Sequence, residues 1–376
     1  MRSSAQLLRE LIALPSVNPA FLPAGHPNAG EHRVADYLAA VAAKGGLEIE
    51  FQDVFPNRRN LFARLRPSGK ITRRILLAPH MDTVGLANDD QLKPGEKRGR
   101  LYGRGACDTK GSVAAMLSAL LQVAESGKRP ASTEIIFIGL IDEENNQSGS
   151  RAVAKSGLKA DLAIVGEPTR LEVVTAHKGD LWLSLETRGK AAHGARPELG
   201  KNAVHDMARI VDLLETTYRR QLKKRQHPLL GHPTINVGSI RGGTQPNIVP
   251  DHCEIAVDRR TLPGETEARV RREIIALLKQ HGLSAKIQNN KGAACLALET
   301  SPDLPLVRQL LGLARQTKPV GVHYFCDASV LSAGGIPSIV FGPGDIAQAH
   351  TAAEWISLTS LERGTALLTS FLRSLD

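Results

Sequence analysis

Six residues of the types that bind divalent metals recur in comparable places along this chain. They are His80, Asp108, Glu143, Glu144, Glu167 and His350. Taken singly, each has an ordinary explanation, since an acidic residue before a helix is usually a cap and a loop histidine is usually solvated. Five of the six, however, follow segments whose interiors are apolar. The joint pattern predicts that these side chains gather around bound metal.

The apolar segments have the length and composition of buried strands. RRILLAP (73–79) leads into His80, EIIFIGLI (134–141) toward the acidic pair, DLAIV (161–165) toward Glu167, and PSIVFGPG (337–344) through a short loop to His350. Asp108 instead follows the glycine-rich turn GRGAC and opens a helical pattern. In an open α/β sheet, ligands gather beyond the carboxyl ends of the strands. We therefore expect one site at that edge.

The donor types indicate which metal the site takes. Two histidines, one aspartate and two glutamates suit zinc, with cobalt or manganese as substitutes. Three carboxylates, two divalent cations and one bridging hydroxide sum to zero charge, whereas a single cation leaves excess negative charge. We therefore expect two Zn²⁺ per chain.

The elements that carry these residues indicate an α/β fold. Over about the first 170 residues, continuous apolar strands alternate with helical patterns, which is typical of a mostly parallel sheet with helices on both faces. Residues 179–290 instead read as an α+β unit in the order βαββαβ. The α/β pattern returns afterwards. We expect a discontinuous catalytic domain, residues 1–178 and 291–376, interrupted by an inserted domain at 179–290.

Composition excludes several functional classes. The 376-residue chain has a net charge of +10, but its basic residues are scattered and aromatic residues make up 4%, so we predict no nucleic-acid binding. No apolar stretch approaches the roughly 20 residues of a membrane span, and we predict no membrane association. The four cysteines are far apart and form no CxxC pair. This spacing favours a reducing, cytoplasmic location.

Eight segments resemble one family over nearly the whole chain. They are APHMDTV (78–84), GRGACDTKG (103–111), IDEEN (141–145), GEPT (166–169), AHGARPELGKNA (192–203), GGTQPNIVPD (242–251), DRRTLPGE (258–265) and GPGDIAQAHTAAEW (342–355). In this order they resemble the zinc-dependent aminoacylase and carboxypeptidase group. That group includes acetylornithine deacetylase, succinyl-diaminopimelate desuccinylase and glutamate carboxypeptidase. The resemblance implies a zinc-peptidase-like catalytic domain and an inserted dimerisation or lid domain.

The resemblance also implies a role for each residue of the metal site. One zinc would be bound by His80 and Glu167, the other by Glu144 and His350, with Asp108 between them. Asp82 would hydrogen-bond the second ring nitrogen of His80 and orient it. Glu143 matches the family's general base, which takes a proton from the metal-activated water and passes it to the leaving nitrogen.

Three further residues of the inserted domain match family positions that contact the substrate. His193 corresponds to a histidine that reaches the active site of the partner subunit and stabilises the oxyanion. Arg260 corresponds to an arginine that binds the substrate carboxylate, and Asn247 to an accompanying amide donor. The resemblance therefore implies a homodimer formed through the inserted domain.

The expected activity is metal-dependent hydrolysis of the amide bond of an N-acyl-L-amino acid, as in acetylornithine deacetylase. A dipeptidase, carboxypeptidase or succinyl-diaminopimelate desuccinylase would use the same site, so the substrate is a small N-acyl amino acid or a dipeptide. A third alternative is a binding protein that kept the fold and lost catalysis. The presence of all five ligands and the base disfavours that alternative.

Overall fold

The computed structural model describes residues 3–127, 129–292 and 295–376. By internal contacts the chain divides into two compact units. Unit 1 comprises Met1–Thr175, Thr300–Val320 and Cys326–Asp376, and unit 2 comprises Ala176–Glu299 and Gly321–Phe325. The boundaries of the inserted domain at residues 179 and 290 remain our proposal.

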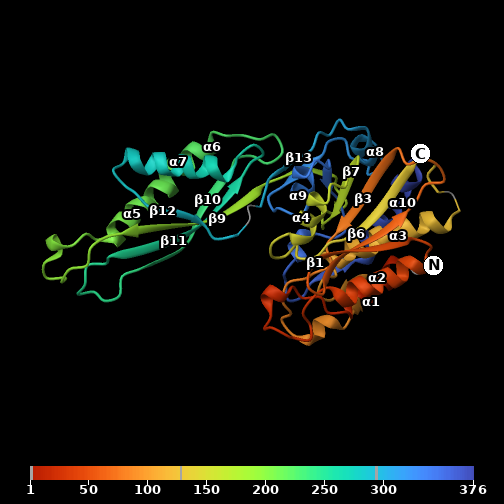
Figure 1. Ribbon diagram of the computed structural model, residues 1–376, viewed down its shortest axis with the longest axis horizontal. Helices are drawn as coiled ribbons and strands as arrows, with labels where there is room; N and C mark the ends of the chain where they lie inside the picture. Colours follow the sequence, from red (N-terminus) through yellow and green to blue (C-terminus); the bar gives the residue numbers. More distant parts are fainter. Residues whose placement is uncertain (1–2, 128, 293–294) are drawn as a thin grey trace. The chain divides into compact units, whose positions relative to one another are not determined.

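Unit 1 is built on a mostly parallel sheet, as predicted (Figure 1). Its strands are ordered β1-β2-β6-β3-β7-β15; the bounds are β1 Glu48–Phe55, β2 Arg58–Leu65, β3 Arg73–Pro79, β6 Thr133–Gly139, β7 Leu162–Gly166 and β15 Ser338–Val340. The four central strands β6, β3, β7 and β15 are parallel, whereas β2 pairs antiparallel with both β1 and β6. Strands β6, β7 and β15 are buried along their length, and β3 is buried after its first two residues, which explains their continuous apolar sequences.

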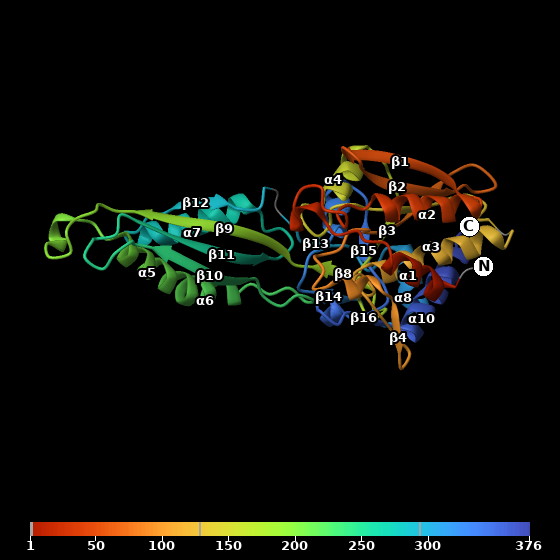
Figure 2. The ribbon, with the colours of Figure 1, turned by 90° about the horizontal axis from the view of Figure 1, so that it is seen from below.

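Helices cover both faces of this sheet (Figure 2). One layer contains α1 Ser4–Ile12, α2 His32–Lys44, α3 Lys110–Glu125, α8 Pro305–Leu313 and α10 Leu358–Arg373, and the other contains α4 Ser148–Lys155 and α9 Ala328–Ala333. Alternate strand residues such as Leu77 and Phe137 join the core under the first layer. A separate three-stranded sheet consists of β4 Gly95–Lys97, β5 Arg100–Tyr102 and β16 Trp355–Ser357.

Unit 2 has the predicted βαββαβ order. Its elements are β9 Gly179–Arg188, α5 Ala203–Leu213, α6 Arg219–Lys223, β10 Thr234–Gly242, β11 His252–Thr261, α7 Glu267–Gln280 and β12 Lys286–Asn289. The antiparallel sheet is ordered β10-β11-β9-β12, and β11 alternates buried and more exposed residues. The buried face packs against α5 and α7 in a core of its own, and Figure 1 shows the helices along this face. The large sheet continues beyond β15 through the short strands β8 Val174–His177 and β13 Leu298–Glu299, and β14 Val320–Val322 also pairs with β8.

No helix within the described residues is both long and apolar enough to cross a bilayer.

A fully buried lysine begins α3 and gives the fold a pH dependence that can be measured. Lys110 donates to the carbonyl oxygens of Leu11 and Leu14 at 3.0 and 2.7 Å. Burial lowers the pKa of Lys110 from 10.5 to about 7. Between these values unfolding takes up a proton, so raising the pH opposes unfolding. We therefore expect Lys110 to make the free energy of unfolding rise with pH in this window, by at most about 1.4 kcal/mol per pH unit.

We expect Lys110→Met to lose this rise. Urea unfolding of wild type and variant at several pH values between 7 and 10 measures the difference in slope. Lys44→Met, at an exposed position, is the control and should keep the wild-type slope. If the free energy of unfolding changed with pH by the same slope in wild type and in Lys110→Met, Lys110 would be charged in the folded protein.

Candidate metal site

The predicted metal-binding side chains come together at one edge of the central sheet of unit 1. Because β3, β6, β7 and β15 are parallel, their carboxyl ends lie along this edge. Each strand end supplies a predicted residue: His80 after β3, Glu143 and Glu144 after β6, Glu167 after β7, and His350 in the loop after β15. Asp108 joins them from the turn that precedes α3.

Asp108 stands between the two histidines. Its Oδ1 lies 3.2 Å from Nε2 of His80, and its Oδ2 lies 3.3 Å from Nε2 of His350. Glu167 Oε1 is 3.8 Å from the first imidazole nitrogen, and Glu144 Oε2 is 3.1 Å from the second. The residues thus form two groups of three whose ligand atoms lie within 4.8 Å of one another, and Asp108 belongs to both groups. This arrangement suits two cations that share one carboxylate.

The donor atoms fit divalent metals. Imidazole nitrogens and carboxylate oxygens are the ligands of zinc, cobalt and manganese sites. Within the described part of the chain, the buried Oε1 of Glu144 has no hydrogen-bond partner. A buried acceptor without a partner is costly. A cation held by Asp108, Glu144 and His350 would supply that partner.

The electrostatics of this edge also favour cations. Loss of hydration raises the pKa of Glu144 to about 7, and the charge of Asp108 adds to the effect. Burial raises the pKa of Glu167 well above its usual range; His80 opposes this and Asp108 reinforces it. Hydrogen bonds to Asp108 and Glu144 raise the pKa of His350 to about 10. Divalent cations would displace these protons and relieve the repulsion among the carboxylates.

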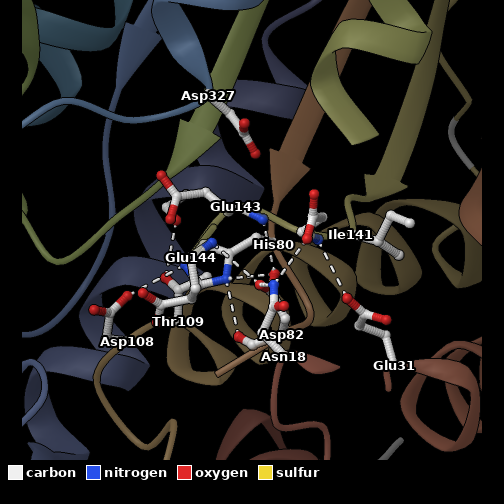
Figure 3. Close-up of polar contacts among 12 residues, drawn as sticks. Asn18, Glu31, His80, Asp82, Asp108, Thr109, Ile141, Glu143, Glu144 and Asp327 are labelled. Atoms are coloured by element: carbon white, nitrogen blue, oxygen red, sulfur yellow. Dashed lines mark hydrogen bonds and ion pairs between the residues drawn. The ribbon is translucent and has the colours of Figure 1, made fainter. Parts of the chain in front are cut away.

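Asp82 organises the same edge (Figure 3). Nδ1 of His80 lies 3.4 Å from its carboxylate and 3.0 Å from its backbone oxygen. The carboxylate also accepts hydrogen bonds from the backbone N–H groups of Glu143 and Glu144, both at 3.1 Å, and from Asn18 at 2.8 Å. Asp82 therefore orients the imidazole and also holds the segment that carries both glutamates. The sequence predicted the first of these roles and not the second.

A buried polar network behind Asp82 was not predicted. Asn18 also donates to Asp142 at 3.0 Å, and Arg58 donates to Asp142 at 3.2 Å and to Glu31 at 2.6 and 2.9 Å. Asp142 has a left-handed backbone (φ 63°), a conformation that persists where surrounding contacts over-determine it. Asn18 is 64 residues from Asp82 and 124 from Asp142. No local sequence pattern signals partners so far apart.

Glu143 is the predicted residue that remains beside the two groups of ligands (Figure 3). Burial raises its pKa well above the usual range, while His80 lowers it and Glu167 and Asp327 raise it. Asp327 is buried, accepts a hydrogen bond from Ser150, and was not predicted. An acid held in such surroundings is suited to accept and release a proton.

Comparison with known proteins agrees with this geometry. The family model of Peptidase family M20/M25/M40 matches residues 76–374. The chain belongs to this family. It is 34% identical over 353 residues to acetylornithine deacetylase of Myxococcus xanthus, covering 89% of each chain. It is 32% identical over 375 residues to acetylornithine deacetylase of Proteus mirabilis (strain HI4320), covering 95% of this chain and 92% of that one.

A solved structure shares the whole fold. The crystal structure of aminopeptidase PepT from Bacillus cereus ATCC 10987 superposes with a TM-score of 0.78 at 23% identity, covering 98% of this chain and 97% of that one. Membership of the family, together with the acetylornithine deacetylase relatives, confirms the predicted enzyme class: the chain is a metal-dependent hydrolase.

The remaining predicted residues of this M20/M25/M40 chain lie on unit 2, where two of them are neighbours. His193 pairs with Ile248 in an antiparallel bridge, and the N–H of Gly194 donates to the carbonyl oxygen of Asn247 at 2.7 Å. Nδ1 of His193 accepts the N–H of Ala195 at 3.1 Å. A neutral imidazole bound in this way carries its hydrogen on Nε2. His193 is exposed and can therefore offer an N–H donor.

Arg260 lies at the other end of the unit 2 sheet. It pairs with Asp180 on β9, whereas His252, at the end of β11 nearer Asn247, pairs with Arg188. The eight residue steps of extended strand from Asp180 to Arg188 span roughly 27 Å. Arg260 of one chain is thus too far from His193 and Asn247 of the same chain to contact the same small substrate.

Arg260 is already engaged by carboxylates of its own chain. Its Nε and Nη2 donate to the two oxygens of Asp258 at 2.9 and 3.0 Å, and Nε lies 3.7 Å from Asp180. The guanidinium is thereby held in a fixed orientation. A substrate carboxylate would have to share Arg260 with Asp258 or displace it, which the sequence did not indicate.

Gly194 offers a test of the His193 segment. A Cβ added at this position would lie 2.9 Å from the carbonyl carbon of Asn247, closer than real Cβ contacts. Gly194→Ala should therefore push His193 away from Asn247. If His193 has the catalytic role that the resemblance implies, kcat should fall by about 10-fold or more, because small misplacements of catalytic groups are costly. Steady-state kinetics measure this effect. Gly238→Ala is the control: on the same unit, a Cβ there would meet only ordinary contacts at 3.8 Å, so kcat is not expected to fall.

Proposed function

We propose that this chain is a two-zinc deacylase that hydrolyses the amide bond of N-acyl-L-amino acids. The observation that carries the proposal is the pair of ligand groups sharing Asp108, with Glu143 beside them and outside both groups. Both curated relatives described above are acetylornithine deacetylases, which supports an N-acyl amino acid as the substrate.

Zinc fits the donor set best, with cobalt or manganese as substitutes. One ion would be held by His80, Asp108 and Glu167, and the other by Asp108, Glu144 and His350. When bound, the metal supplies Lewis acidity for the amide carbonyl and lowers the pKa of water. Asp82 keeps His80 in the tautomer that presents Nε2 to this site.

Glu143 would move the proton that the reaction requires. Its carboxylate accepts a proton from the attacking water as the oxygen–carbon bond forms. The same proton then passes to the amide nitrogen as the carbon–nitrogen bond breaks, which releases a carboxylic acid and an amine and returns Glu143 to its ionised state. The N–H of Glu143 donates to Asp82, so the backbone that carries the Glu143 side chain is held in place.

The active site would also take residues from a second copy of the chain. His193 offers an Nε2–H donor for the oxyanion that forms when water attacks the carbonyl. Its distance from Arg260 along the unit 2 sheet supports a site that combines Arg260 of one chain with His193 and Asn247 of another. We therefore propose a homodimer formed through the inserted domain.

Mixed dimers provide a direct test of the shared site. Glu143→Gln and His193→Ala homodimers should each be nearly inactive. A purified heterodimer of the two variants has one site with both changes and one with neither, so it should recover about half of the wild-type activity. If His193 acted within its own chain, both sites of the heterodimer would carry one change and no activity would return.

The substrate class is tested by a hydrolysis panel. We expect N-acetyl amino acids, including N-acetylornithine, to have a higher kcat/KM than dipeptides and succinyl-diaminopimelate. A hundredfold preference for dipeptides corresponds to about 2.7 kcal/mol of transition-state discrimination. Such a preference would contradict the deacylase proposal and favour a dipeptidase that uses the same residues.

A further inference from the structure

The turn before Asp108 is wrapped around a buried carboxylate that plays no part in the mechanism described above. Glu354 is 1% exposed. Its Oε1 accepts the backbone N–H groups of Cys107 and Asp108 at 2.8 and 2.9 Å, and its Oε2 accepts that of Gly105 at 3.0 Å. Arg104 donates to Oε2 at 2.8 Å. Four donors therefore meet a single side chain.

This arrangement is a backbone nest around an anion. Burying a carboxylate is costly unless hydrogen bonds replace its hydration, and here three of the bonds come from one turn. Gly105 makes the turn feasible, because its φ of 79° is rarely adopted by other residues and a Cβ there would lie 2.8 Å from Lys110. The conformation of the turn thus depends on the charge at its centre.

Glu354 also belongs to the segment that carries His350, which is four residues earlier. The backbone oxygen of Glu354 accepts the N–H of Gly103 at 3.1 Å, and the oxygen of Ala352 accepts a hydrogen bond from Gln91 at 2.9 Å. Beyond Glu354, Trp355 pairs with Tyr102 in the β5–β16 ladder. The segment is therefore attached on both sides of the nest.

These contacts join two parts of the metal site that are far apart in the sequence. Asp108 donates its own N–H to Glu354, while the Asp108 carboxylate lies 3.3 Å from His350. We propose that Glu354 is a positioning residue that sets the spacing between the shared ligand Asp108 and His350. This inference rests on the metal site of the proposed function and not on the identity of the substrate.

Glu354→Gln tests the proposal with little change of shape. The amide keeps one accepting oxygen but turns an NH₂ group toward backbone N–H donors, so the nest should open. Titration of the metal-free protein with Co²⁺, followed by visible absorption, reports both affinity and coordination. We expect affinity to fall about 10- to 100-fold, the usual effect of removing a residue that supports metal ligands. The Co²⁺ ion held by Asp108, Glu144 and His350 should show the larger loss of affinity and an altered absorption spectrum.

The matched control is Glu362→Gln, the same change at an exposed residue of α10. It should keep wild-type affinity and spectrum. If Glu354→Gln also keeps both, Glu354 does not position the ligands. Should Glu354→Gln not fold, Glu354→Asp replaces it: this variant keeps the charge but shortens the reach, and it should weaken Co²⁺ binding and alter the spectrum. Wild-type behaviour of Glu354→Asp would then overturn the proposal.

A double variant separates positioning from simple charge balance. Arg104 is buried beside Glu354, so the carboxylate could serve merely to neutralise it. Arg104→Gln combined with Glu354→Gln removes both charges. Continued weak Co²⁺ binding supports the positioning role, whereas recovery of wild-type binding would overturn it. Failure of the wild-type chain itself to bind two Co²⁺ would instead contradict the proposed metal pair.

Discussion

Replacing Glu143 with glutamine is expected to lower kcat by about 10²- to 10⁴-fold while the metals remain bound, because general acid–base catalysis contributes a factor of that size. Glutamine has nearly the same shape but cannot take up a proton from water or pass one to the leaving nitrogen. The backbone hydrogen bond from residue 143 to Asp82 does not involve the side chain, so the loop should keep its place. KM should change little, since the lost interaction belongs to the transition state.

Kinetics with the best N-acyl amino acid of the panel, together with metal analysis, measure this effect. Glu172→Gln, the same change at an exposed residue, is the control and should retain full activity. If Glu143→Gln turned over at the wild-type rate, Glu143 would not be the base. If the variant instead lost metal, the residue would be a ligand.

The second large effect is expected from Asp108→Asn. Each oxygen of Asp108 faces a different histidine, at 3.2 and 3.3 Å, so the single change affects both groups of ligands. An asparagine side chain has no charge and can offer only one oxygen. We expect the bound metal to fall from two ions per chain to at most one, and kcat/KM to fall by at least about 100-fold.

Equilibrium dialysis followed by elemental analysis counts the ions. Asp212→Asn, at an exposed position on α5, should bind metal as the wild type does. Loss of an ion from Asp108→Asn with full activity would mean that one metal suffices for the reaction. Retention of two ions at wild-type affinity would contradict a shared carboxylate.

Much of the metal site could be predicted from the chain because its signals are local. A buried parallel strand must be apolar along its length, so a histidine or glutamate just beyond its carboxyl end stands out. His80, Glu144 and Glu167 were found in this way, and the parallel pairing of β3, β6 and β7 then brings these residues together. The βαββαβ order of unit 2 could also be predicted, because apolar and polar residues alternate along half-buried strands such as β11.

Other predictions came from resemblance, and they remain proposals. The roles of His193, Asn247 and Arg260 and the homodimer belong to this group. The cytoplasmic location, inferred from the cysteine spacing, and the choice of zinc, inferred from the donor types, also remain proposals. Physical chemistry supports some of them in the structure, such as the Nε2–H donor of His193. The proposed binding of a substrate carboxylate by Arg260 must also compete with Asp258, which holds the guanidinium from two residues away.

The sequence by itself determined the fold class, the order of elements and the set of candidate metal-binding side chains, because strand burial and turn chemistry act over short segments. Only the tertiary structure decided how those side chains are held. The contacts of Asp82 with Asn18, and of Glu354 with the turn before Asp108, join residues separated by 64 and by about 250 positions. The energy of such buried polar contacts depends on exact distance and on the exclusion of water, and neither is encoded in any local pattern.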